Sequence, residues 1–254
     1  MLIIRPTTLS HPSITSININ GELIQSKSFA KSLGVYFDST LTMSQHIKEI
    51  TQVCYMNLRN LWMISYKLQF RLKIQLVHSL ILSRLDYCNG ILYGILDHHL
   101  MELQKVQNAA VRFIFGKEIK KFDHISPYLK LLHFLPIKYR IMFKIALLCF
   151  KCLNNIAPEY LKGIITPKIN SSMNLRIDED PFLLEVPQRP QFVKSEKAFY
   201  YAGPTIWNAL PYSIRSSQNV DSFKVALKSH YFLSAFEGVT TARSYQQLQQ
   251  HVDI

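Results

Sequence analysis

The chain has 254 residues, of which 48% are hydrophobic and 18% are charged, a composition that supports a buried core and excludes disorder throughout. Its 29 lysines and arginines exceed its 17 aspartates and glutamates, and the net charge of +12 favours a polyanionic partner, either nucleic acid or an anionic membrane surface. The four cysteines are too few for a secreted disulfide scaffold and indicate a reducing compartment.

The amino-terminal sequence does not predict a signal peptide, because Arg5 and Pro6 follow only three apolar residues after Met1. The longest apolar run, residues 141–153, contains two lysines and is shorter than the roughly 20 residues that a membrane span needs. We therefore expect a soluble chain that is cytoplasmic or nuclear and not secreted, with no membrane partner.

Residues 1–41 predict a small antiparallel β element. Asn20-Gly21 is a dipeptide typical of tight hairpin turns, and isoleucine and leucine residues lie on both sides of it. A further strand over residues 33–37 ends at Asp38, so we expect three or four short strands of one sheet. Such a sheet is marginal alone, and its edge expects a neighbouring strand.

Residues 42–165 predict a helical bundle. Apolar residues recur every three or four positions from about 42 to 65, with Thr42 and Gln45 as a capping box. A second helix runs from about residue 70 past 85 and then either continues through Asn89-Gly90 or breaks there.

Three further signals extend the bundle. A helix begins with Asp97 as its N-cap and stops at Gly116. Ser126-Pro127 and Pro136 each open another helix, and Pro158 starts a short one.

The carboxy-terminal third is less regular. Periodicity fails over residues 166–193, where four prolines accumulate around Asp178-Glu179-Asp180, and this pattern predicts a Pro-rich linker with a solvated acidic run. Residues 194–236 predict a helical docking segment in which Trp207 is the apolar anchor, Pro204 opens a short helix and Pro211 closes it. Residues 237–254 form a polar tail.

Common catalytic motifs are absent from the sequence: GxxxxGK[ST], GxGxxG, GxSxG and HExxH do not occur. Cys149 and Cys152 form a CxxC that could be half of a zinc site or a redox pair, but their apolar helical setting favours buried core. His98 and His99 are expected to face solvent. We predict no catalytic residue, no metal site and no cofactor.

The distribution of charge is more informative. No acidic residue lies between Glu49 and Asp86 or between Asp123 and Glu159, so the predicted helices carry unopposed basic residues, as binding to a phosphate backbone requires. The candidate nucleic-acid-binding residues are Arg59, Lys67, Arg71, Lys73, Lys105, Arg112, Lys117, Lys120 and Lys121. For Arg112, which lies between two apolar residues, the alternative is that its guanidinium binds carbonyls inside the fold.

Six blocks occur in order along the chain: SLGVYFDSTLTMSQHI (32–47), SRLDYCNGILYG (83–94), LQKVQNAAVRFIFG (103–116), LHFLPIKYRIMFKI (132–145), APEYL (157–161) and AGPTIWNALPYSIR (202–215). Through these blocks the chain resembles, from about residue 20 to residue 236, the carboxy-terminal part of reverse transcriptases from non-LTR retrotransposons of the jockey and chicken-repeat lineages. The resemblance implies that residues 33–38 end the palm and that 42–92 begin the thumb, which lies along the template and primer duplex. Residues 100–236 would form a carboxy-terminal extension.

The chain departs from that family at its catalytic residues. Polymerase chemistry needs two magnesium ions held by carboxylates, which the family supplies from an early palm aspartate and a Tyr-x-Asp-Asp hairpin. This sequence has no two adjacent aspartates, and Met1 falls after the position of that hairpin. Asp38 and Asp86 cannot stand in, because one ends a strand and the other lies far along the helical region.

We therefore expect a catalytically incomplete fragment of an RNA-directed DNA polymerase, which retains at most binding of RNA or an RNA/DNA duplex through its basic helices. The alternative is a non-catalytic protein-interaction or decayed module without a nucleic-acid role, whose partner is the missing palm or another protein.

Overall fold

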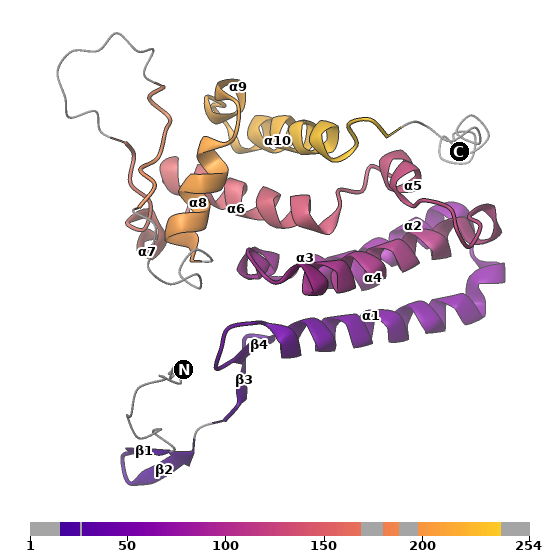
Figure 1. Cartoon of the computed structure of the whole chain (residues 1–254), viewed down its shortest axis with the longest axis horizontal. Helices are drawn as coiled ribbons and strands as arrows, with labels where there is room; N and C mark the ends of the chain where they lie inside the picture. The colour runs from indigo at the N-terminus through magenta and orange to yellow at the C-terminus, as the bar shows by residue number, and fades with distance from the viewer. Residues whose placement is uncertain (1–15, 26, 169–179, 188–197, 240–254) are drawn as a thin grey trace.

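Helix-forming and turn-forming segments alternate along the chain and produce a mainly helical structure with a small antiparallel β element at its amino-terminal side (Figure 1). The computed structural model describes residues 16–25, 27–168, 180–187 and 198–239. The predicted fold class is confirmed. Within these ranges, no helix combines the length and the apolar character that crossing a membrane requires.

Four short strands form two separate hairpins. They are β1 (Ser16–Ile19), β2 (Glu22–Gln25), β3 (Phe29–Ser32) and β4 (Val35–Asp38). The first hairpin turns at Asn20-Gly21, as predicted, with φ values of 52° and 90°. The prediction of one sheet is wrong, because Leu33-Gly34 makes a second tight turn, with φ values of 46° and 82°, and folds β4 back onto β3 alone.

The junction between β4 and the first helix is built around Asp38. Helix α1 (Ser44–Ile64) begins after Met43, and its N-cap lacks a side-chain hydrogen bond, so the predicted capping box is wrong. Instead, the Asp38 carboxylate accepts hydrogen bonds from the backbone N–H groups of Thr40, Thr42 and Met43 at 3.0, 2.9 and 2.7 Å. The Thr42 N–H, which Gln45 would bind in a capping box, donates to Asp38 instead, and the Gln45 amide donates to Glu49.

The second and third predicted helices form a layer against α1. Helix α2 (Phe70–Val77) continues through the π turn η2 (His78–Leu82) into α3 (Ser83–Asp86), and the short 3-10 helix η3 (Asn89–Leu92) follows a break at Cys88. Helix α4 (Asp97–Phe115) packs along α1 (Figure 1).

The ends of α4 test two predictions. The N-cap is Leu96, with no side-chain cap bond, so the prediction that Asp97 caps the helix is one residue out. Gly116 ends α4 as predicted, with a φ of 61° that glycine adopts without strain, and its N–H donates to the carbonyl of Arg112.

Helix α6 (Ile137–Leu153) is central to the bundle, because it lies between the layer of α2, α3 and α4 and the later helix α10 (Figure 1). It follows α5 (Ser126–Leu131), which carries Pro127 in its first turn, and it precedes the single turn α7 (Glu159–Lys162). Pro136 and Pro158 are the N-caps of α6 and α7, so the predicted proline starts are confirmed.

The last three helices are α8 (Phe199–Asn208), α9 (Tyr212–Arg215) and α10 (Val220–Ala235). Pro204 lies inside α8 and does not open it, because buried residues on both sides of this proline, Ala202 and Ile206, belong to one helical face against α6. Helix α8 ends at Asn208, ahead of Pro211 as predicted, and Pro211 is also the N-cap of α9.

Trp207 fixes α8 within the fold. Only 1% of its surface is exposed, its ring stacks on Phe223 of α10 at 5.7 Å between centroids, and its Nε1–H donates to the carbonyl of Phe182 at 2.6 Å. The same segment, residues 180–187, is also held by Asn208, whose side chain exchanges hydrogen bonds with the backbone of Leu184.

The acidic run of the predicted linker requires a correction. Asp180 is not solvated, because its carboxylate forms an ion pair with the buried guanidinium of Arg215. Asp178 and Glu179 lie outside the described residues, as does most of the predicted tail, of which only residues 237–239 are described.

Candidate nucleic-acid interface

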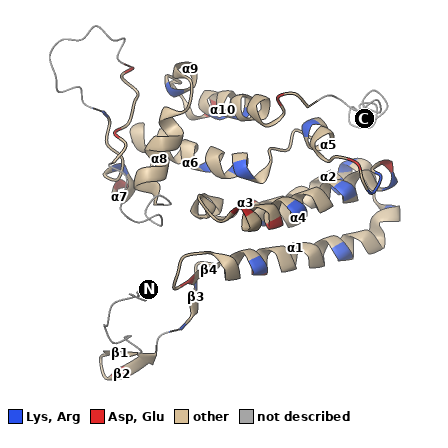
Figure 2. Cartoon of the chain, in the orientation of Figure 1, with Lys and Arg blue, Asp and Glu red and all other residues tan. Residues whose placement is uncertain are grey.

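Five of the predicted basic residues lie at one end of the bundle (Figure 2). There, the turn η1 (Ser65–Lys67) and the start of α2 meet the turn η4 (Gly116–Glu118) and the loop that follows it, since the rings of Phe70 and Phe115 pack edge to face at 5.4 Å. We term this surface the tip and define it by its exposed members: Tyr66, Lys67, Arg71, Lys117, Lys120, Lys121 and Phe122.

Three other predicted residues lie on the flanks of helices and not at the tip. Arg59 is exposed on α1, and Lys105 is exposed on α4, about 15 Å of helix before Phe115. Lys73 is half-buried, with its Nζ 5.9 Å from the centroid of the Phe113 ring. These three cations are therefore not counted among the exposed residues that define the tip.

Arg112 belongs inside the fold. Its guanidinium donates to the backbone carbonyls of Lys120, Lys121 and Asp123 at 2.9, 3.5 and 3.1 Å. Of the two alternatives that the sequence left open, the geometry supports the structural one, because the donors that would face a phosphate already bind the loop. Arg112 therefore does not belong to the candidate interface.

Two exposed aromatic rings accompany the cations of the tip, and the charge pattern did not reveal them. Phe122 is 88% exposed and Tyr66 is 79% exposed. The Nζ atoms of their sequence neighbours lie over the rings, Lys121 at 5.6 Å from the Phe122 centroid and Lys67 at 5.4 Å from the Tyr66 centroid. The adjacent pairs Tyr-Lys and Lys-Phe in the sequence are the signal that could have found them.

A groove of about 480 Å³ lies beside the tip. Its lining combines the apolar residues Ile125, Leu129 and Pro136 with the polar residues Gln104, Asn108, Arg112, Asp123, His124 and Ser126. Gln104 is fully engaged, because its amide donates to Gln107 and Asn108 and its oxygen accepts from the N–H of Ile137. Asn108 Oδ1 accepts from Gln104, and its side-chain nitrogen donates no hydrogen bond to any described residue.

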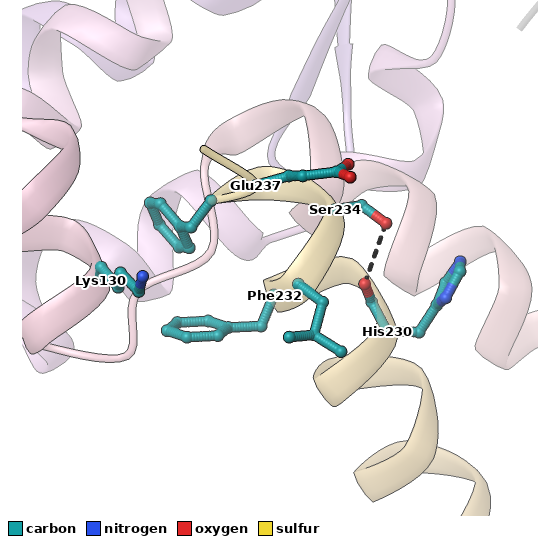
Figure 3. Close-up of a pocket in the computed structure, with 7 residues that line it drawn as sticks. Lys130, His230, Phe232, Ser234 and Glu237 are labelled. Carbon is teal, nitrogen blue, oxygen red and sulfur yellow. Dashed lines mark hydrogen bonds between the residues drawn. The ribbon is translucent and has the colours of Figure 1, made fainter. Parts of the chain in front are cut away.

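A second cavity, of about 350 Å³, lies between α5 and the end of α10 and is lined by residues that include Lys130, His230, Ser234 and Glu237 (Figure 3). Ser234 Oγ donates to the backbone carbonyl of His230 at 3.0 Å and not to its imidazole, so the pair is no nucleophile and base. Lys130 Nζ donates to the carbonyl of Val239 at 3.4 Å. These contacts hold the end of α10 and provide no catalytic arrangement.

The cysteine and histidine predictions have different outcomes. Cys149 and Cys152 are both buried, as the core interpretation expects, and burial raises the pKa of each thiol. His98 is exposed as predicted, but His99 is not, because its side chain is only 12% exposed and its Nε2 lies 3.0 Å from Ser44 Oγ of α1.

Among the described residues, no three His, Cys, Asp or Glu side chains are grouped closely enough to hold a metal ion. Asp38 and Asp86 have structural roles. Asp38 binds the backbone of the loop that leads into α1, and Asp86 forms an ion pair with Arg140 of α6.

No family model, no curated protein and no solved structure matches the chain at a significant level. The fold and the tip together define a helical protein with a basic and aromatic surface at one end.

Proposed function

We propose that this chain binds nucleic acid, either RNA or an RNA/DNA duplex, through the tip, and that it derives from the carboxy-terminal part of a non-LTR retrotransposon reverse transcriptase. The observation that carries the binding is the convergence of five exposed cations from two segments of the chain. Within those segments, residues 65–71 and 116–125, Glu118 is the one exposed acid.

The physical basis is the release of counterions. Each lysine or arginine that neutralises a phosphate frees a condensed cation, so affinity falls steeply with salt. If all five tip cations contact phosphates, the slope of log affinity against log salt concentration is about −4. Contacts of this kind are largely independent of sequence.

We propose further that the chain does not polymerise nucleotides by itself. Two observations support this proposal. The sequence has no adjacent aspartates of the kind that the family uses. The carboxylate of Asp38 is engaged in hydrogen bonds to the loop before α1, and that of Asp86 is engaged in an ion pair. Primer extension by the purified chain with magnesium and nucleotides would contradict this part of the proposal.

The binding is tested by fluorescence anisotropy with a labelled RNA and a labelled RNA/DNA duplex between 50 and 200 mM salt. In the variant K117Q/K120Q/K121Q we expect weaker binding and a salt slope less negative by about 2.5. The matched control is K138Q/K144Q/K228Q, which removes the same charge from exposed positions on α6 and α10. No binding at 50 mM salt, or an equal loss in the control, would overturn the proposal.

One observation favours protein interaction as a second candidate function. The first hairpin exposes apolar side chains on both faces of β2, Leu23 on one and Ile24 on the other, and a two-stranded hairpin alone is marginally stable. Pairing of its edge with a strand of another protein would cover these residues. This function predicts self-association or poor solubility of the purified chain, and light scattering from a stable monomer would count against it.

A further inference from the structure

The loop that carries Phe122 is fixed on both sides of the ring. Arg112 holds three of its carbonyls, and the Asp123 carboxylate accepts a hydrogen bond from the N–H of Lys120 at 2.8 Å. The flanking residues Ile119 and Ile125 are buried. Phe122 therefore remains exposed on a backbone that is ordered by its own contacts.

An exposed aromatic ring with an ammonium group over it is suited to binding a nucleotide. A nucleobase can stack on the ring while its phosphate meets the lysine, and stacking of this kind tolerates any base because every base has a π face. The Phe122 and Lys121 pair supplies both elements within one dipeptide, and the Tyr66 and Lys67 pair supplies them again at the same end of the bundle.

The groove beside the loop provides a site for the hydrogen-bonding edge of a nucleobase. Its volume of about 480 Å³ is within the range of small-molecule sites, and two residues that line it, Asp123 and His124, directly follow Phe122. Asn108 presents an amide nitrogen without a protein acceptor among the described residues. Amides and imidazoles are groups that bind the hydrogen-bonding edges of unpaired bases.

In a duplex the base faces are stacked on one another and cannot reach Phe122 or the groove. We infer that the tip binds a single strand of nucleic acid, with one base stacked on Phe122 and the strand's phosphates on Lys117, Lys120 and Lys121. This inference rests on the proposed nucleic-acid binding and narrows its ligand from RNA or an RNA/DNA duplex to an unpaired strand.

The inference is tested with the full chain by measuring its affinity for a 12-nucleotide oligouridine and for a 12-base-pair RNA duplex at 50 mM salt. We expect tighter binding of the single strand. In F122A its affinity falls about 10-fold, while affinity for the duplex and the salt slope stay unchanged, because the cations remain. F122L separates aromatic stacking from apolar bulk and is expected to lose nearly as much as F122A.

Tyr160 provides the matched control, because it is an aromatic residue of α7, away from the tip, and is 75% exposed. Y160A is expected to bind both ligands as the wild type does. If F122A weakens both ligands equally, or if the wild type prefers the duplex, the single-strand inference fails and the proposed function stands. If the wild type binds neither ligand, both fail.

An anionic membrane is the other surface that basic and aromatic residues can bind. Vesicles with 30% phosphatidylserine test for it. Vesicle binding that needs Phe122 and that oligouridine does not displace would overturn the inference.

Discussion

The guanidinium of Arg215 in α9 forms an ion pair with the carboxylate of Asp180, 35 residues earlier in the chain. Their side chains are only 8% and 17% exposed, and Arg215 also donates to the carbonyl of Asn208 at 3.0 Å. Together with the bond from Trp207 to Phe182, this pair fixes a proline-rich segment against α8 and α9.

Removing one partner of this pair is expected to be costly. R215A leaves the Asp180 carboxylate largely buried without its cation, and we expect the free energy of unfolding to fall by about 3 kcal/mol. Urea unfolding followed by circular dichroism measures the change. The control is K224A, which breaks the exposed pair between Lys224 and Asp221 on α10 and should cost less than about 0.5 kcal/mol. Similar losses in both variants would contradict the argument.

Short-range pattern predicted much of this fold because helix periodicity is local. The apolar spacing of α1, α4 and α6 and the stop at Gly116 depend on residues within a few turns. The prediction that Asp180 is solvated was wrong because its partner, Arg215, is distant in sequence. The prediction that Pro204 opens a helix was wrong because packing against α6 outweighs the local preference of proline for a first turn.

The candidate site was only partly predictable for the same reason. The acid-free stretches of the sequence indicated the lysines of the tip. Their position at one end of the bundle follows from the packing of α1 and α2 on α4, which includes the contact of Phe70 with Phe115. Which arginine binds its own backbone depends on the path of the loop, and the sequence does not fix that path. The sequence could therefore name Arg112 as a candidate, but it could not decide whether its guanidinium binds a phosphate or the backbone of the loop.

The crossing of α6 and α8 leaves no room for a side chain at Gly203. A β-carbon there would lie 3.0 Å from the sulfur of Cys149 and 3.2 Å from the ring of Phe199. We expect G203A to lower the free energy of unfolding by about 1 to 3 kcal/mol, although alanine favours a helix by about 1 kcal/mol over glycine. Thermal and urea unfolding measure the difference.

Two variants control this prediction. At Gly163 a β-carbon would meet no atom within 4 Å, and its φ of −73° suits any residue, so G163A should be neutral or slightly stabilising. Adding C149A to G203A removes the nearest contact and should recover part of the loss relative to C149A alone. No recovery would show that the sulfur is not the obstacle.

The Asp38 junction predicts a dependence of stability on pH. Burial raises the pKa of this carboxyl, but hydrogen bonds from Thr40, Thr42 and Met43 outweigh it and lower the pKa from 3.8 to about 2. Because the folded pKa is the lower one, the stabilisation is present above pH 4 and is lost as pH falls from about 4 to 2. With allowance for solvent screening, we expect D38N to cost about 1 kcal/mol at pH 6. Urea unfolding should show that the difference in free energy of unfolding between D38N and the wild type is smaller at pH 2.5 than at pH 6. An equal difference at both pH values would refute this account.

Thiol reactivity should distinguish the four cysteines. Burial raises the pKa of Cys54 to about 11, with Arg84 opposing it, and burial also raises the pKa of Cys149 and Cys152. Thiolate is the reactive form, so these three should resist iodoacetamide at pH 8 in the folded protein. Cys88 is exposed and should react first. Mass spectrometry of digested protein gives the order, and C88S should remove the fast phase; rapid labelling of Cys149 would contradict the buried assignment.

If Arg112 positions the loop, its loss should loosen the loop without changing the cations that the tip presents. In R112Q we expect faster hydrogen exchange at the N–H groups of Lys120 and Asp123, which bind the Asp123 carboxylate and the Lys120 carbonyl in the wild type. K105Q, at an exposed position on the same helix, removes the same charge and should leave that exchange unchanged. R112Q should also weaken binding of oligouridine severalfold, because Phe122 no longer has a fixed position, while its salt slope stays close to that of the wild type. A change in slope of about 1 would instead mean that Arg112 contacts a phosphate itself.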